Sequence, residues 1–72
     1  MIQPTGFYRA TVVDVKDPEN RKRVRLRIPH ILGEAVTGWA EPMACIWKPD
    51  VGDVVWATFE GGDLSYPLYL FI

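Results

Sequence analysis

The chain has 72 residues, 49 % of them hydrophobic, and a formal net charge of −1. This length allows one domain, residues 1–72, and the hydrophobic share excludes a disordered chain. The near-neutral charge argues against a strongly basic nucleic-acid-binding protein, and no apolar stretch approaches the length of a membrane span.

The single cysteine, Cys45, allows no intrachain disulfide and favours synthesis in a reducing compartment. The N-terminal residues lack a charged region followed by an apolar run, so we expect no signal peptide and no stable membrane insertion. A core of this size without a disulfide or a metal points to oligomerisation as a further source of stability.

The first elements are two strands and a turn. Residues 6–15 are rich in β-branched and aromatic side chains, which predicts a strand. Residues 16–20 carry the Asp, Pro and Asn that are typical of turns. In residues 21–28, Arg23, Arg25 and Arg27 alternate with apolar residues, so we predict a second strand with a row of arginines on one face. The two strands are expected to form a hairpin.

The rest of the chain continues in short pieces. Pro29, Gly33 and Gly38 disfavour a long helix in residues 29–38 and predict an irregular connection. We expect a third strand within residues 39–47, interrupted near Pro42, a fourth at 54–60 and a fifth at 68–72, separated by turns at 48–53 and 61–67. This pattern suits an OB-fold or an SH3-like barrel, and the long connection after the second strand favours an all-β, five-stranded OB-fold Greek-key barrel.

A series of short motifs runs along nearly the whole chain in a fixed order. Its members are Asp14, Asp17, Pro18, Arg23, Val24, Leu26, Pro29, Gly38, Trp39, Ala40, Pro49, Gly52, Asp53, Val55, Phe59, Gly62, Asp63 and Pro67. This order resembles the OB domain of phage baseplate hub and spike proteins, the baseplate assembly protein V family, and of VgrG-like spikes in type VI secretion. That family often has glycine before its R-V-x-V strand, where this chain has Lys22.

The resemblance implies a structural component of a phage tail tip or a related injection machine. Such a protein is synthesised in the host cytoplasm, becomes part of the virion, docks on hub proteins, supports a spike protein and forms a homotrimer. Many spike proteins continue into a lysozyme domain or a β-helix, whereas this chain stops at Ile72. We therefore expect no cell-wall-cleaving activity to carry over.

Candidate partner contacts come from the arginines and the aromatic residues, because interfaces are enriched in Trp, Tyr and Arg. Alternation in residues 54–60 predicts Val55, Ala57 and Phe59 inside and Trp56 outside. For Trp56, packing over a barrel end is an equally weighted alternative, and a solvated face is the alternative for the arginines. The predicted protein interface consists of Arg23, Arg25, Arg27, Trp56, Tyr66 and Tyr69.

No group of residues suggests catalysis, a metal or a cofactor. His30 has no zinc-like spacing to other ligands, so we interpret it as a loop histidine, Cys45 as a small buried residue and Asp17 as a turn former. We therefore predict a non-enzyme. One alternative is a single-stranded nucleic-acid-binding OB-fold protein, disfavoured because no aromatic residue accompanies the arginine row. Another is a spike-associated enzyme whose catalytic domain lies elsewhere.

Overall fold

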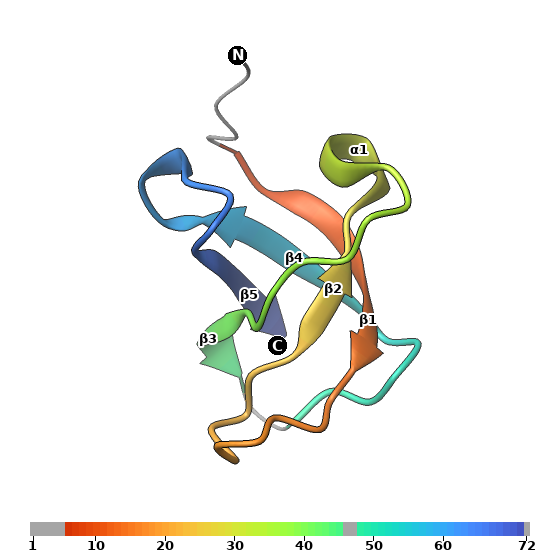
Figure 1. The fold of residues 1–72 in the computed structure, drawn as a ribbon, viewed down its shortest axis with the longest axis vertical. Helices are drawn as coiled ribbons and strands as arrows, with labels where there is room; N and C mark the ends of the chain where they lie inside the picture. The colour runs from red at the N-terminus through yellow and green to blue at the C-terminus, as the bar shows by residue number, and fades with distance from the viewer. Residues whose placement is uncertain (1–5, 46–47, 72) are drawn as a thin grey trace.

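A five-stranded sheet organises the computed structural model, which describes residues 6–45 and 48–71. Two short helical turns accompany it, α1 (Pro29–Leu32) and the 3-10 turn η1 (Glu60–Gly62), as Figure 1 shows. The chain is therefore all-β, as predicted. The strands are β1 (Tyr8–Asp14), β2 (Arg25–Arg27), β3 (Glu41–Cys45), β4 (Val54–Phe59) and β5 (Pro67–Phe71).

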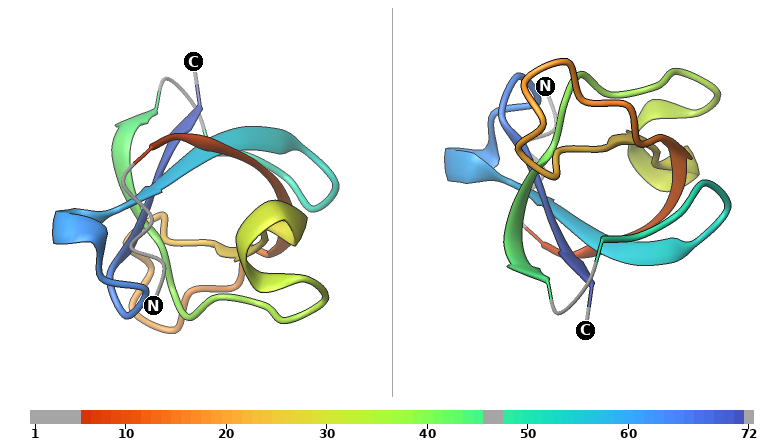
Figure 2. Two further views of the ribbon diagram at one scale, coloured as in Figure 1. Left: turned by 90° about the horizontal axis from the view of Figure 1, so that it is seen from above. Right: turned by 90° about the horizontal axis from the view of Figure 1, so that it is seen from below.

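The strands follow the order β2-β1-β4-β5-β3. Neighbouring strands are antiparallel except β3 and β5, which are parallel. Figure 2 shows the sheet curling around a common interior. On the side where β2 approaches the start of β3, Val24 and Ala40 exchange backbone hydrogen bonds of 3.2 and 2.7 Å. This one isolated pair, and no continuous ladder among the described residues, joins the segments beside β2 and β3, so the predicted barrel is incompletely closed.

The core lies inside this curled sheet, and alternation along the strands selects it. In β4, Val55, Ala57 and Phe59 are buried, which confirms the predicted inward face. Burying such side chains is the main favourable term in folding, and a domain this small depends on nearly all of them. The buried apolar residues are Ala10, Val12, Val24, Leu26, Ile28, Ala40, Val55, Ala57, Phe59 and Tyr69.

The second strand is shorter than predicted, because the segment before it turns instead of extending. Asn20 and Lys22 have φ angles of 54° and 64°, in the left-handed region that interrupts a strand. Regular β pairing therefore begins only at Arg25. The hairpin between β1 and β2 is present as expected, with a register shift between Val12 and Asp14.

The connection from β2 to β3 is irregular, as predicted, and α1 accounts for only four residues of it. The buried residue Thr37 completes the hydrogen bonding of β2. The Leu26 N–H donates to Thr37 Oγ1 at 3.0 Å, and the Thr37 N–H donates to the Leu26 carbonyl at 2.9 Å. Thr37 thus takes the place of a strand neighbour at this edge, with its hydroxyl as the acceptor and its backbone N–H as the donor.

The third strand has the predicted interruption near Pro42. Its pairing with β5 shifts register between Pro42 and Ala44. A proline at this place is tolerated because it sits at an irregularity, where it need not donate to the ladder. The predicted extension of this strand through residues 46–47, residue 72 of the fifth strand and the side chain of Cys45 lie outside what the structure describes.

Candidate protein interface

The predicted arginines alternate with buried apolar residues, but they do not form a uniform charged surface. Val24 and Leu26 are fully buried, and the arginines between and beside them point away from the core. Each of the three arginines has a different environment. Their availability to a partner is decided by the groups that surround them.

Arg23 is held by the turn that precedes it. Its Nε and Nη2 atoms donate to Asp17 Oδ2 and Oδ1 at 2.9 and 2.8 Å, a two-point ion pair. Only 2 % of the Asp17 side chain and 15 % of the Arg23 side chain are exposed. Such two-point contacts fix geometry as well as charge. Arg23 is therefore a folding contact, and only a small part of its side chain is left exposed to a partner.

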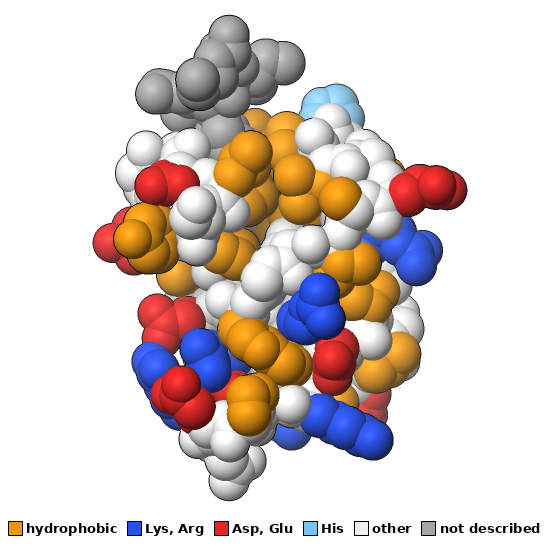
Figure 3. All heavy atoms as spheres, viewed as in Figure 1, with side chains coloured by type: hydrophobic (Ala, Val, Ile, Leu, Met, Phe, Trp, Pro, Cys, Tyr) orange, Lys and Arg blue, Asp and Glu red, His pale blue; other side chains and the backbone are white. Residues whose placement is uncertain are grey.

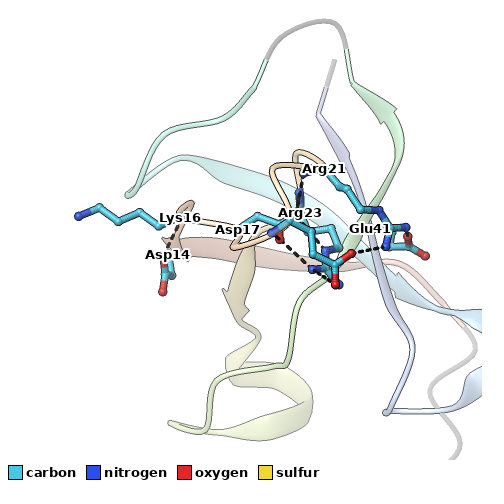
Figure 4. A network of polar contacts seen from close by, with 7 residues as sticks. Asp14, Lys16, Asp17, Arg21, Arg23 and Glu41 are labelled. Atoms are coloured by element: carbon cyan, nitrogen blue, oxygen red, sulfur yellow. Dashed lines mark hydrogen bonds and ion pairs between the residues drawn. The ribbon is translucent and has the colours of Figure 1, made fainter.

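Asp17 also receives three backbone hydrogen bonds, from the N–H groups of Glu19, Arg21 and Arg23. The guanidinium of Arg23, followed by these N–H groups, holds the pKa of the Asp17 carboxyl well below its usual value of 3.8. The predicted turn former is thus the centre of a loop network, drawn in Figure 4. The loop network consists of Asp17, Glu19, Arg21, Arg23 and Glu41.

The other arginines of residues 21–27 differ in how far their charge is paired. Arg21 lies between Glu19 and Glu41 and pairs with both. Arg25 donates from Nε to the Thr37 carbonyl at 3.2 Å, whereas Arg27 is exposed and forms no ion pair within residues 6–45 and 48–71. Figure 3 shows basic and acidic side chains intermixed on this face. This arrangement lacks the continuous basic groove that a nucleic-acid backbone requires.

A second surface lies on the outside of β1, β4 and β5, and we call it the outer face. The register aligns Arg9, Trp56 and Leu70 across these strands. Trp56 is 47 % exposed and points outward as predicted, with the Arg9 guanidinium 5.4 Å from its ring centroid. The outer face consists of Arg9, Thr11, Val54, Trp56, Thr58, Leu68 and Leu70.

The two candidate tyrosines differ sharply. Tyr66 follows η1 and is 59 % exposed, so it remains a candidate contact. Tyr69 is fully buried, and its hydroxyl donates to the Lys22 carbonyl at 2.5 Å. It lies beside Ala57 in the register, where the small side chain leaves room for the ring. Tyr69 is therefore a core residue, and including it in the interface was wrong.

The described ranges contain no group of three or more His, Cys, Asp or Glu residues placed to hold a metal ion. His30 is exposed and stacks on Tyr8 with ring centroids 5.8 Å apart. It lies in α1, so its interpretation as a loop residue needs correction. None of the helices in this part of the chain is long and apolar enough to cross a membrane.

A comparison with family models decides the family. The model of the type VI secretion system/phage-baseplate injector OB domain matches residues 8–72. The chain belongs to this family. No curated protein matches it. The match confirms the resemblance in the motifs, and it makes this injector OB domain a structural part of a phage baseplate or related injection machine.

The structure also explains the departure at Lys22. In the motif that the chain resembles, glycine often occupies this place, and the left-handed φ of Lys22 is a conformation that glycine adopts without cost. The injector OB domain here keeps the backbone geometry with a lysine, whose carbonyl anchors Tyr69. The left-handed lysine therefore marks a constraint of the fold and not a binding site.

Two contacts of the site were missed in the sequence. The pairing of Asp17 with Arg23 spans a turn of unknown shape, so neither residue alone signals it. The stacking of Arg9 on Trp56 depends on the register of β1 against β4. The register follows from alternation only once the strand order is known.

Proposed function

We propose that this injector OB domain is a non-enzymatic adapter at the tip of a phage tail or related machine. The outer face docks on hub proteins, and the domain supports the central spike. The exposure of Trp56 on a largely apolar sheet face carries this proposal. The family supports the setting, since hub and spike proteins are the neighbours expected for an OB domain of an injection machine.

The outer face has the chemistry of a protein contact. Buried Trp residues are among the side chains that contribute most to interface affinity, and apolar neighbours exclude water around them. Val54 is exposed beside Trp56, while Leu68 and Leu70 are half-buried. Arg9 holds a positive charge over the indole ring, where it fixes the orientation of the ring and of an acidic partner group.

The proposed assembly is a homotrimer around the tail axis. A domain of this size buries a smaller fraction of its surface than larger domains do, and contacts between copies add to the buried area. Light scattering on the purified chain tests this part directly. A mass of three chains supports the trimer, and a concentration-independent monomer contradicts it.

The docking test uses matched variants of the full chain. Each hub protein encoded beside this chain is immobilised, and binding of the wild-type domain, Trp56→Ala and Leu64→Ala is measured. Leu64 lies outside the sheet and is exposed to nearly the same degree as Trp56, so it controls for the loss of an exposed apolar side chain. Trp56→Ala is expected to weaken binding about 30-fold or more, corresponding to about 2 kcal/mol, and Leu64→Ala to have little effect. Equal affinities of all three would overturn the outer face as the docking surface.

Nucleic-acid binding is the competing outcome. Since Arg21 and Arg23 are paired with carboxylates, the proposal expects no measurable binding of a labelled single-stranded oligonucleotide at physiological salt. Submicromolar binding that falls steeply with rising salt would instead support a nucleic-acid function.

A further inference from the structure

Among the described strands, the first half of β1 has a neighbour on one side only. Residues 8–11 pair with β4, whereas pairing with β2 starts at Thr11, which lies opposite Arg27. After Arg27 the chain leaves the sheet and enters α1, at the end of the sheet where β1 begins (Figure 1). No described strand therefore covers the β2 side of residues 7–9. We call these three residues the β1 edge.

The direction of the backbone groups in β1 follows from a contact further along the strand. The Val12 N–H donates to the Asp53 carbonyl at 2.9 Å, and the Val12 carbonyl accepts from the Gly52 N–H at 2.8 Å, so Val12 faces the β4 side. Successive residues of an antiparallel strand direct their N–H and C=O groups to opposite sides. Thr11 and Arg9 therefore face the β2 side, where β2 pairs with Thr11 and no described residue pairs with Arg9.

The β1 edge presents three backbone groups that have no partner within the described residues. Two of them are the N–H and the carbonyl of Arg9. The third is the Phe7 carbonyl, because the peptide bond between Phe7 and Tyr8 is trans and the Tyr8 N–H faces β4. One donor between two acceptors is a pattern that an incoming extended strand can complete.

Pro29 keeps the β1 edge open. Continuing the register of β1 and β2 by two residues beyond Arg27 would place Pro29 opposite Arg9. Proline has no N–H to donate, and the Pro29 carbonyl already accepts from the Gly33 N–H at 3.2 Å in the turn of α1. The segment that follows β2 therefore cannot complete the β1 edge.

A groove of about 710 Å³ lies along the β1 edge, and we call it the edge groove. Its lining consists of Phe7, Tyr8, Arg9, Pro29 and His30. Phe7 is 57 % exposed, and the Tyr8 and His30 rings stack with their centroids 5.8 Å apart. Tyr8 also packs against the core, which anchors this stack. The edge groove thus offers aromatic surface directly beside the unpaired backbone groups, and its volume is large enough for side chains of a bound segment.

The side chains around the β1 edge indicate the chemistry of the strand that fits it. Arg9 is exposed, lies over the Trp56 ring and forms no ion pair among the described residues. None of the described lining residues carries a carboxylate. A residue paired with Arg9 directs its side chain to the same face of the sheet as Arg9, so an acidic side chain fits at that position. Its two neighbours face the Tyr8 and His30 rings, so apolar side chains fit there.

From these observations we infer that the β1 edge binds an extended segment of a partner protein in which acidic and apolar residues alternate. The segment adds a strand to the sheet, accepts from the Arg9 N–H and donates to the carbonyls of Phe7 and Arg9. A single-stranded nucleic acid could supply negative charge, but it lacks the regular row of backbone donors and acceptors that the β1 edge requires. The inference goes beyond hub docking by the outer face and does not depend on it, because Trp56 lies on the opposite side of β1.

The test follows amide hydrogen exchange of the full chain by two-dimensional NMR. The probe is a nonapeptide with blocked ends that alternates valine and glutamate. In the free domain the Arg9 N–H is expected to exchange rapidly, whereas the Ala10 N–H, which faces β4, is expected to be protected. Saturating peptide should slow exchange of the Arg9 N–H about tenfold or more and leave the Ala10 N–H unchanged.

Two N-methylated forms of the peptide separate backbone pairing from charge attraction. Methylation of every glutamate nitrogen removes the donors that face the β1 edge, keeps the charge and should abolish binding. Methylation of the valine nitrogens, which point away from the β1 edge, should leave binding in place. Equal affinities of the two methylated peptides would overturn the inference.

Matched charge reversals in the protein test the acidic character of the segment. Arg9→Glu should weaken peptide binding about tenfold or more. Lys16→Glu makes the same change at an exposed lysine beyond the other end of β1 and should bind within about twofold of the wild type. Equal binding by Arg9→Glu and the wild type would contradict the acidic partner.

The exchange data also identify the other possible occupants of the β1 edge. Protection of the Arg9 N–H in the free domain at every concentration would mean that the chain covers its own edge, and protection only at high concentration would assign the edge to a second copy. Either result, or protection by a single-stranded oligonucleotide and not by the peptide, would overturn the inference. Trp56→Ala should bind the peptide as the wild type does whatever its effect on hub binding, so the two proposals can fail separately.

Discussion

The loop network and the outer face differ in their chemistry. The loop network is made of charged side chains that pair with one another, whereas the outer face is largely apolar and exposed. The loop network gathers five charged side chains, four from residues 17–23 and Glu41 from β3, and each of its two guanidiniums pairs with two carboxylates. The outer face is part of a regular strand, yet it leaves Trp56 and Val54 exposed. The charged residues of the loop network pair within the folded chain, whereas apolar residues of the outer face remain exposed. A candidate binding surface is therefore better recognised by the exposure that remains after pairing than by residue type.

The largest expected effect comes from breaking the centre of the loop network. Asp17→Asn removes the charge of the two-point ion pair and leaves the Arg23 guanidinium with only its longer, more exposed ion pair to Glu19. We expect the greatest loss in the free energy of unfolding of all the variants discussed here, measured by urea denaturation. Trp56→Ala on the outer face should change the same quantity by no more than about 0.5 kcal/mol. Similar losses in the two variants would contradict the contrast between the regions.

Acid should weaken the loop network in a defined pH range. Because the pKa of Asp17 is lower in the folded state than its usual 3.8, its contribution to stability is complete above that value and declines as the pH falls toward the folded-state pKa. The difference in unfolding free energy between wild type and Asp17→Asn is therefore expected to shrink from about pH 4 to about pH 2. Glu34→Gln, an exposed carboxylate without an ion pair in the described residues, is the control. A difference that stays constant with pH would refute the role of the carboxylate charge.

A smaller effect is expected where the loop network meets the core. Tyr69→Phe removes the hydroxyl that donates to the Lys22 carbonyl and keeps the buried ring. We expect a loss of about 1–2 kcal/mol, because the carbonyl loses its partner. Thermal unfolding of Tyr69→Phe and of the exposed control Tyr66→Phe provides the measurement. An equal effect in both would show that the buried hydrogen bond contributes nothing.

The smallest effect is expected at Lys22, where a substitution should raise the free energy of unfolding. Lys22→Gly relieves a left-handed backbone conformation that costs a non-glycine residue about 1 kcal/mol or more. Glycine also gains entropy in the unfolded chain, so we expect a net gain below about 1 kcal/mol. Lys16→Gly, where φ is not positive, should lower stability under the same denaturation conditions. A loss in Lys22→Gly would mean that the lysine side chain contributes more than its backbone costs.

Alternation made much of the fold predictable. It correctly assigned the buried side of residues 24–28 and of β4, and turn residues located the breaks between strands. Alternation does not predict which residue contacts an outward-pointing side chain. The ion pair between Arg23 and Asp17 could therefore not be predicted from the sequence. Tyr69 was assigned to the interface by its residue type and not by alternation, and its burial beside Ala57 became visible only with the pairing of β4 and β5. The local pattern therefore predicted which way a side chain points from its strand. The partners of that side chain depended on contacts between distant segments.

The link between Tyr69 and Lys22 has a consequence for the order of folding. It joins positions 47 residues apart, and β1 finds its central neighbour only in β4. Contacts of such long range require large loops to close, which slows folding. During synthesis, β1 and β2 emerge first and have no partner that completes their core until β4 and β5 have left the ribosome. The domain is therefore expected to fold late and in one step, with its last strand providing the residue that fixes its first turn.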